Sequence, residues 1–386
     1  ALLPATAHAG TFVVDAQMGA GADFPDVQVA LNSTLVVDGD TLLIRPGSYS
    51  RVVTSKSVTM KGLGASPDDV NFFKSFVPWE YSEFRDCTGP VRFSNVRFAK
   101  IFVYNTTQPV HFVGVRMSHL FVRSAQFVRV ENEGLGSLPP FSVDVFEDSN
   151  AEFLQCSFLG SYGLEGQDGG IAARVRLNSF ARFADCEFEG GPGSNHFYGS
   201  LGGTGGVGLH VEDNSRVQLV GKSGNLIRGG YGGWGLTVPE DGDGGVGLAV
   251  DVSSFVRRSN YDLIGGVNPG SGLPSAGYEG FAASLTTALV PDPLMTRTGS
   301  FAPGATSTFH LLGEPGATAI AFFGLQAKST PIANIIGDLA TNFNGAFLTT
   351  QTDATGNFNF DVLMPLDMPI GTLATMQSGM VYLSDG

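Results

Sequence analysis

The feature that most limits how this chain can fold is an eight-residue pattern that recurs along it. The pattern is a small or branched residue, a polar residue, Phe, two variable residues, Val or Cys, one variable residue and an apolar one, and it is clearest at residues 91–98. Further copies begin at Val110, Ala151 and Ala181, with weaker ones at Ala125 and Val217. This spacing favours a strand that turns a corner with its apolar side chains inward. Self-similarity with a period of a few tens of residues predicts a solenoid.

Two further columns of residues support the same register. One predicts an inward ladder of branched side chains, made of Val145, Val175, Val211 and Val250. The other predicts a shared turn position, occupied by Ser149, Ser179, Ser215 and Ser254. On the outer surface of the predicted sheet, adjacent rungs are expected to stack Asp144, Arg174 and His210. Opposite charges in adjacent rungs stabilise a sheet modestly.

The opening of the chain predicts a cap for the solenoid. Residues 11–15 read as a strand, and residues 24–31 as a short helix with Asp23 as its cap and Pro25 in the first turn. This opening, with the run from Gly39 to Tyr49 and the repeats up to about residue 266, resembles the pectin-lyase-like family. The resemblance implies an all-β fold, a right-handed parallel β-helix with an N-terminal capping helix. It implies no single activity, since that fold hosts lyases, hydrolases, esterases and non-enzymes.

The start of the chain predicts an exported protein. Residues 1–10 contain Ala7-His8-Ala9, a small-x-small run typical of the end of a signal peptide, and are read as a remnant of that signal or an N-terminal tail. We therefore expect a secreted protein, extracellular or at the cell surface. No later apolar run reaches membrane-spanning length, so membrane insertion is not expected.

Composition divides the rest of the chain. The β-helix is expected over residues 11–267, with long loops on one side, because 20 of the 58 residues from 190 to 247 are Gly. Residues 268–293 read as a linker rich in Gly, Pro, Ser and Ala. Residues 294–386 predict a small β-sandwich, which resembles the C-terminal modules of secreted planctomycete-type bacterial proteins.

Charge and cysteine content exclude several classes of function. A net charge of −14 argues against nucleic-acid binding, which needs a basic surface. The three Cys lack zinc-ligand spacing; Cys156 and Cys186 share one slot of neighbouring repeats, as buried free thiols or as a disulfide. We expect no metal and no cofactor. The one alternative is Ca²⁺ at residues 240–244, although a solvated turn is favoured there because the spaced ligands of a calcium loop are missing.

The most suggestive surface is basic. Residues 91–130 hold six Arg or Lys, two His and no acidic residue. The repeat stacks these side chains in three pairs: Arg92 over His111, Arg97 over Arg116, and Lys100 over His119. Stacked like charges destabilise a sheet, so one interpretation is a site for an anionic glycan or for another subunit. The other interpretation, which we favour, is that the charges are solvated or neutralised by other parts of the assembly.

The catalytic motifs of the resembled family are absent from the sequence, which favours a protein without enzymatic activity. We predict a structural or surface protein of the matrix, filament or surface-layer type that binds glycans. Its partners would be further copies of itself or extracellular polysaccharide. The alternatives are a lyase or glycoside hydrolase acting on acidic polysaccharide, and a receptor-binding adhesin. His196, Tyr198, Tyr231 and Trp234 either stack on sugar rings or fix the Gly-rich loops.

Overall fold

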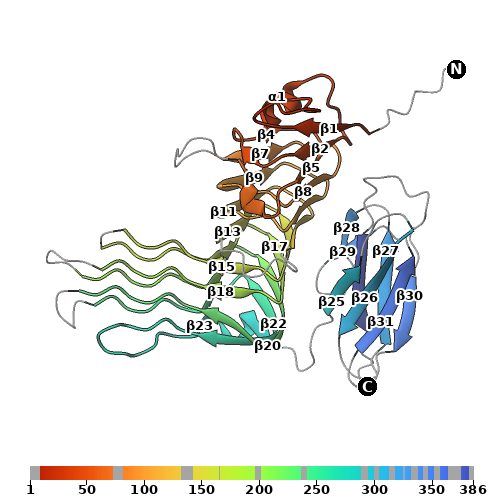
Figure 1. Cartoon of the computed structure of the whole chain (residues 1–386). Helices are drawn as coiled ribbons and strands as arrows, with labels where there is room; N and C mark the ends of the chain where they lie inside the picture. Colours follow the sequence, from red (N-terminus) through yellow and green to blue (C-terminus); the bar gives the residue numbers. More distant parts are fainter. Residues whose placement is uncertain are drawn as a thin grey trace.

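The chain is almost entirely β-structure. The computed structural model describes residues 9–72, 81–131, 142–164, 166–195, 201–235, 241–287, 304–305 and the strands between 294 and 381. Two long parallel sheets coil around one apolar core, and antiparallel strands follow from residue 294 (Figure 1). This confirms the predicted all-β class and the parallel β-helix. The described helical turns are α1 (Val27–Asn32), η1 (Pro67–Asp69) and η3 (Ala282–Ser284).

The first long sheet has thirteen strands. They are β1 (Thr11–Val14), β2 (Thr41–Ile44), β5 (Thr59–Gly62), β8 (Val91–Ser94), β10 (Val110–Val113), β12 (Val128–Glu131), β14 (Asn150–Leu154), β15 (Ser157–Leu159), β17 (Phe180–Ala184), β18 (Glu187–Glu189), β20 (Arg216–Arg228), β22 (Phe255–Ile264) and β24 (Leu285–Thr287). Each strand pairs in parallel with the equivalent strand of the next rung, as a solenoid requires.

The second long sheet has nine strands, also parallel. They are β4 (Val53–Thr54), β7 (Ser82–Arg85), β9 (Lys100–Tyr104), β11 (His119–Arg123), β13 (Ser142–Phe146), β16 (Ala173–Val175), β19 (Leu209–Val211), β21 (Leu248–Val250) and β23 (Tyr278–Gly280). A short third side lies between the two sheets. It begins with β3 (Gly47–Ser48) and β6 (Val70–Asn71) and continues through single bridges from Asn71 to Arg97 and from Arg97 to Arg116.

The predicted repeat register is confirmed, with one correction. Val91 pairs with Val110, and Ala151 pairs with Ala181. The copy assigned to Ala125 is wrong, because Val128 is the residue that pairs with both Val110 and Ala151. The preceding Phe127 has a φ of 62°, so it belongs to the turn before the strand and not to the strand.

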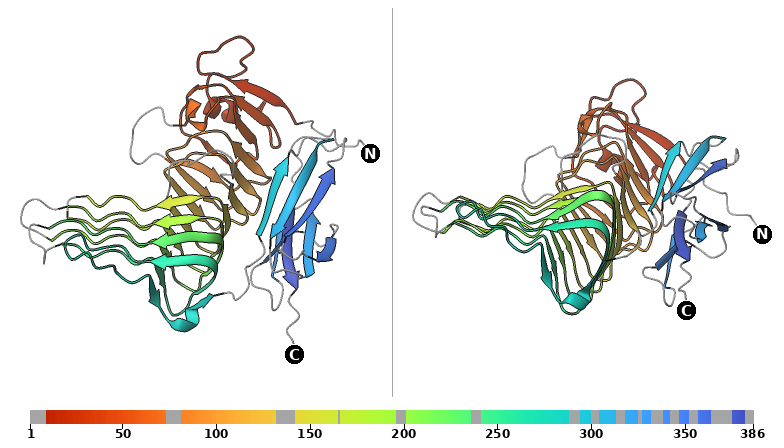
Figure 2. Two further views of the ribbon diagram at one scale, coloured as in Figure 1. Left: turned by 60° about the horizontal axis from the view of Figure 1, so that its bottom comes forward. Right: turned by 90° about the horizontal axis from the view of Figure 1, so that it is seen from below.

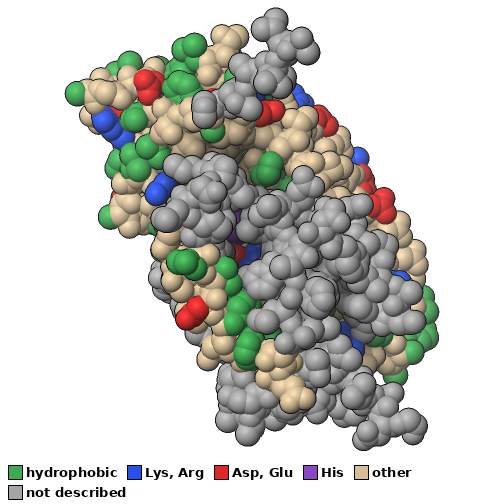
Figure 3. Space-filling model, turned by 90° about the vertical axis from the view of Figure 1, so that its right-hand side faces the viewer, with side chains coloured by type: hydrophobic (Ala, Val, Ile, Leu, Met, Phe, Trp, Pro, Cys, Tyr) green, Lys and Arg blue, Asp and Glu red, His purple; other side chains and the backbone are tan. Residues whose placement is uncertain are grey.

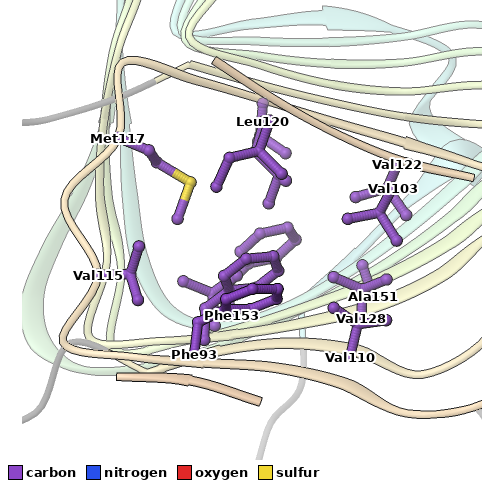
Figure 4. Close-up of a cluster of buried hydrophobic side chains, with 14 of the residues drawn as sticks. Phe93, Val103, Val110, Val115, Met117, Leu120, Val122, Val128, Ala151 and Phe153 are labelled. Atoms are coloured by element: carbon purple, nitrogen blue, oxygen red, sulfur yellow. The ribbon is translucent and has the colours of Figure 1, made fainter. Parts of the chain in front are cut away.

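Stacked Phe rings fill the core along the coil. Phe93 stacks on Phe112 with ring centroids 4.8 Å apart, and Phe153 stacks on Phe183 at 5.0 Å. Val130 occupies the position between Phe112 and Phe153. Figure 4 shows this column with the Val and Leu side chains of the facing strands around it. Each rung thus buries apolar side chains of the rungs on either side of it. A single rung could not bury its own apolar surface.

The predicted serine ladder closes the same rungs. The Ser149 N–H donates to the Oγ of Ser179, the Ser179 N–H to Ser215, and the Ser215 N–H to Ser254, each at 3.1 Å. All four side chains are buried. These hydrogen bonds satisfy turn N–H groups that would otherwise be buried without a partner.

The N-terminal cap is present, but its capping residue differs from the prediction. Helix α1 begins one turn later than expected, and Asp26 is its N-cap, accepting from the Gln28 N–H at 2.8 Å. The predicted cap, Asp23, instead accepts from the Val13 N–H in β1. The second Asp26 oxygen accepts from the Ser50 N–H, so Asp26 also joins the helix to the first rung.

The solenoid continues beyond its predicted end at residue 267. β23 pairs with β21 and β24 pairs with β22, so part of the predicted linker is a further rung. The antiparallel sheets of the C-terminal part agree with the predicted β-sandwich class. They are β25-β26-β31, β30-β27-β32 and the pair β28-β29. The bounds are β25 (Leu294–Gly299), β26 (Thr306–Leu312), β27 (Thr318–Gly324), β28 (Ala327–Pro331), β29 (Asp338–Thr341), β30 (Phe347–Gln351), β31 (Asn357–Leu363) and β32 (Thr375–Val381).

The Gly-rich segments project from one side of the coil, as predicted, but they form an ordered arm (Figure 2). Its outgoing rows are the described residues 160–164, 190–195, 229–235 and 265–268. Its returning rows are 166–171, 201–208, 241–247 and 274–277. The Gly193 N–H donates to Tyr231 in the next outgoing row, and the Gly190 N–H donates to Arg228 just before that row. The N–H groups of Gly191 and Ser194 instead donate to a returning row. The direction in which the backbone N–H groups point therefore repeats every three residues, as in a polyproline-II-type backbone.

Glycine is required inside this arm because neighbouring rows touch through their backbones. A Cβ on Gly191 would lie 1.9 Å from the Ser161 carbonyl oxygen, and one on Gly230 would lie 2.0 Å from that of Gly191. Most inward positions of the rows are therefore glycine, with Ser194 buried among them, while Tyr231 and Trp234 lie where their row faces outward. The arm is thus two hydrogen-bonded layers of extended rows.

Candidate functional site

The structure confirms the three predicted pairs but places them on three different sides of the coil. Arg92 lies beside His111 on the first long sheet, and Lys100 lies beside His119 on the second. The bridge between Arg97 and Arg116 is on the short side between them. The six residues therefore form three small sites rather than one continuous stripe.

Arg97 and Arg116 share one carboxylate, that of Asp68. The Arg97 Nη1 lies 3.2 Å from Asp68 Oδ1, and the Arg116 Nη1 bonds the other Asp68 oxygen. About a third of each Arg side chain is exposed to solvent. We call these three residues the arginine corner. Two guanidinium groups thus meet at one carboxylate.

Sequence reasoning missed Asp68 because it lies outside the repeats. The signal that could have found it is the run Ser66-Pro67-Asp68-Asp69, which opens η1 as a capping box with the Asp69 side chain facing back to the Ser66 N–H. The capping box uses Asp69, so the neighbouring Asp68 carboxylate is left to bind the two guanidinium groups.

The first sheet carries an alternating charge ladder next to His111. Arg129 Nη1 lies 2.8 Å from Glu152 and its Nε bonds Glu131, while Arg182 Nη1 lies 3.0 Å from Glu152. Burial alone would raise the pKa of Glu131, but Arg129 and His111 lower it well below its usual range. Burial lowers the pKa of His111, with the nearby Glu131 acting in the opposite direction. The charged side chains of this ladder therefore neutralise one another.

On the second sheet, His119 is a neutral side chain. Burial is the main cause that lowers its pKa to about 4, with Lys100 adding to the effect. Its ring stacks on Phe121 at 4.0 Å, and its Nδ1 lies against the Ser142 hydroxyl. Lys100 and His119 are therefore not a like-charge pair at neutral pH. The same holds for Arg92 and His111, which leaves the arginine corner as the like-charge pair among the three.

Because His119 is buried as a neutral ring, we expect the folded chain to lose stability in mild acid. Its pKa is about 4 in the folded chain against an ordinary value of 6.5, so the unfolded chain binds a proton more readily through this interval. The free energy of unfolding should fall as the pH drops from about 6.5 to about 4, with His119 supplying at most about 3 kcal/mol of the loss. His119→Phe, which keeps a ring against Phe121, should remove that share. Urea unfolding of both proteins at several pH values measures it; equal slopes would contradict the assignment.

Charges of both signs are scattered along the face of the coil shown in Figure 3. Each of the charged side chains Arg123, Arg174 and Arg176 has a single carboxylate partner: Glu147, Glu212 and Asp144 respectively. Such one-to-one pairs stabilise a sheet and leave little net charge for a ligand. In the arginine corner, by contrast, two guanidinium groups bind the same carboxylate.

The described residues also bear on the two alternatives left open for the cysteines and for a metal ion. Cys156 and Cys186 are buried free thiols, in agreement with the favoured interpretation. Within the described ranges no three His, Cys, Asp or Glu side chains lie close enough to hold a metal ion. Glu240, His196 and Tyr198 lie outside those ranges. Among the described helices none is long and apolar enough to cross a membrane.

The arm presents a second group of functional side chains. Tyr162, Tyr231 and Trp234 are exposed on its outgoing layer, with 61%, 46% and 55% of their surface accessible. Of the two predicted roles for Tyr231 and Trp234, fixing the loops is not needed, because backbone hydrogen bonds already hold the rows. Their rings point outward from an ordered support.

The comparisons with known proteins support no functional assignment. No family model and no curated protein matches the chain. Among solved structures, it is similar to the pectin methylesterase of the rice weevil, at 12% identity and a TM-score of 0.22 over 74% of this chain and 90% of that one. It is also similar to the ORF18 protein of Geobacillus virus E2, at 12% identity and 0.22 over 93% and 74%.

A third similar structure is the enzymatically active domain of tailspike protein 2 from bacteriophage CBA120. It shares 10% identity and a TM-score of 0.19, over 89% of this chain and 62% of that one. Values this low bear on neither activity nor ligand. The fold assignment therefore rests on the strand pairing of the chain itself, a parallel β-helix followed by antiparallel sheets.

Proposed function

We propose that the protein is a secreted structural or surface protein without catalytic activity, which binds anionic glycans at the arginine corner. The observation that carries this proposal is the geometry of the corner: Arg97 and Arg116 lie side by side on the Asp68 carboxylate, and about a third of each Arg side chain is exposed to solvent. A carboxylate or sulfate group of a polysaccharide would bind the solvent-exposed edges of the two guanidinium groups. Guanidinium groups suit such ligands because they bind planar anions through paired hydrogen bonds.

The charge ladder on the first sheet does not provide a general acid for glycan hydrolysis. General acid catalysis needs a carboxyl group that holds a proton near neutral pH. The lowered pKa of Glu131 keeps this group ionised, and Glu152 is bound by Arg129 and Arg182 from two sides. These carboxylates serve as counterions within the sheet.

Removing the arginine corner should weaken binding to an acidic polysaccharide. In native gels containing polygalacturonate, we expect the wild-type protein to be retarded and Arg97→Ala/Arg116→Ala to lose about tenfold in affinity, since each charge-assisted hydrogen bond contributes roughly 1.5–3 kcal/mol before solvent screening reduces it. Asp68→Asn should strengthen binding because it removes a negative charge that competes with the glycan for both guanidinium groups. Added salt should weaken binding in every case.

The matched control is Arg123→Ala, which removes an exposed Arg that has its own partner in Glu147. It should bind polygalacturonate as the wild type does. Unchanged retardation of the double variant would reject the arginine corner as the site. Shortened polygalacturonate after incubation with the wild type would reject the non-catalytic proposal and favour the lyase or hydrolase.

The structural role predicts ordered assemblies of the exported protein. Negative-stain electron microscopy of material taken directly from cells should show filaments or a lattice. Isolated monomers at all concentrations would contradict this part of the proposal and leave the glycan-binding part to its own test.

A further inference from the structure

The two layers of the arm differ in charge. The described outgoing rows contain no charged residue, whereas the returning rows contain Asp168, Asp241 and Asp243. In a chain with a net charge of −14, an uncharged layer that also carries three exposed aromatic rings is a distinct surface. We call its outward side chains the aromatic face: Tyr162, Pro192, Asn195, Tyr231, Trp234 and Val267.

The backbone fixes the spacing of two of these rings. Tyr231 and Trp234 are three residues apart in one row, so the threefold repeat of the backbone directs both side chains outward. Three residues of this conformation span about 9 Å. That spacing is close to the length of a disaccharide unit in an extended polysaccharide. Two rings at this interval can therefore contact alternate sugars of one chain.

The row is held in place on both sides of these rings. Gly230 and Gly233 donate to Gly206 and Gly203 in the returning layer, at 2.8 Å in each case. The Trp234 N–H donates to Asn195 Oδ1 at 2.9 Å, which leaves the Asn195 Nδ2 amide as a donor beside the Trp234 backbone. Because the row is already ordered, binding of a ligand would cost little conformational entropy. A small number of contacts would therefore be enough for measurable affinity.

The pattern of the aromatic face favours a sugar chain over a protein. Along the row a glycine follows each ring, so Tyr231 and Trp234 stand as two separate platforms, and across the rows Pro192 and Val267 flank Tyr231. Sugar rings present apolar C–H faces ringed by hydroxyl groups. They match isolated aromatic platforms that alternate with peptide groups and a side-chain amide.

We infer that the aromatic face is a second binding site, separate from the arginine corner, for an uncharged polysaccharide whose chain runs along residues 229–235. Tyr231 and Trp234 stack on alternate sugars, and Asn195 donates to a hydroxyl group between them. Tyr162, two outgoing rows away, contacts a neighbouring chain or a branch. No charge takes part, so this binding does not depend on salt.

Affinity electrophoresis of the full chain tests the inference, with hydroxyethyl cellulose, laminarin and dextran as neutral probes at low and high salt. We expect at least one probe to retard the wild type equally at both salt concentrations, and Tyr231→Ala/Trp234→Ala to bind it at least tenfold more weakly. Phe281→Ala is the matched control, because that ring is 62% exposed but lies outside the arm, and it should bind as the wild type does.

Three results would overturn the site: no retardation by any neutral probe, equal retardation of the double variant, or retardation abolished by salt. Concentration-dependent self-association that the double variant loses, without glycan binding, would show instead that the aromatic face binds a second copy. Because all described outgoing residues are uncharged, failure here leaves the result for polygalacturonate and the arginine corner unaffected.

Discussion

Replacing Gly230 by Ala is expected to open the arm while leaving the coil folded. The new Cβ would lie 2.0 Å from the Gly191 carbonyl oxygen, a backbone atom that cannot rotate away. The rows must separate, which breaks the bonds from Gly230 to Gly206 and from Gly245 to Gly230. We expect a loss of about 3 kcal/mol in local stability, the upper range for over-packing. Amide protection in the arm should then fall about a hundredfold.

Hydrogen exchange read by mass spectrometry separates the arm from the coil. Peptides from the described rows of the arm should exchange faster in Gly230→Ala, while peptides of β14 and β17 should keep their protection. Tyr231→Ala is the control, since it removes the next side chain along the row, which points into solvent. Equal protection in the two variants would mean that the rows do not touch as described.

The largest effect on the coil is expected from Phe183→Ala. This ring is fully buried and stacks on Phe153 at 5.0 Å, with the edges of Phe158 and Phe188 against it at 5.4 Å and 5.0 Å. Removing it leaves a cavity in the middle of the column. Phe to Ala changes in such positions cost about 3–5 kcal/mol, so we expect about 4 kcal/mol here.

Guanidinium unfolding followed by circular dichroism measures this loss. Phe281→Ala, which truncates an exposed ring, should stay within about 0.5 kcal/mol of the wild type. Because neighbouring rungs of a solenoid stabilise each other, amides of β14 and β20 should lose protection before those near helix α1. A midpoint like that of Phe281→Ala would contradict the description of the core.

Much of the coil could be predicted from the sequence because each rung repeats the same apolar spacing. Val91, Val110, Ala151, Ala181 and Val217 were placed correctly since their inward side chains recur with Phe or Leu two positions later. The rung at Val128 was missed for the opposite reason. It carries Val130 where other rungs carry Phe, and Phe127 in the turn imitates the pattern.

The arm and the arginine corner could be predicted only in part. A run of glycines has no apolar period, so it reads as a loop even where backbone hydrogen bonds join neighbouring rows. The order comes from contacts between rows some 40 residues apart, such as Gly193 with Tyr231. Likewise, Asp68 reaches Arg116 across 48 positions, and the local capping box shows that Asp69 caps η1 but not which groups Asp68 binds.

The threefold repeat of the arm limits how far a protein of this design can vary its reach. One extra residue in a row would rotate every later peptide by a third of a turn, carrying a side chain into the glycine interior. Length can therefore change only in whole steps, three residues outward and three back, in each row that is to stay in register. The rungs of the coil are not limited to changes of three residues. The length of the arm and the sequence of the coil can therefore change independently.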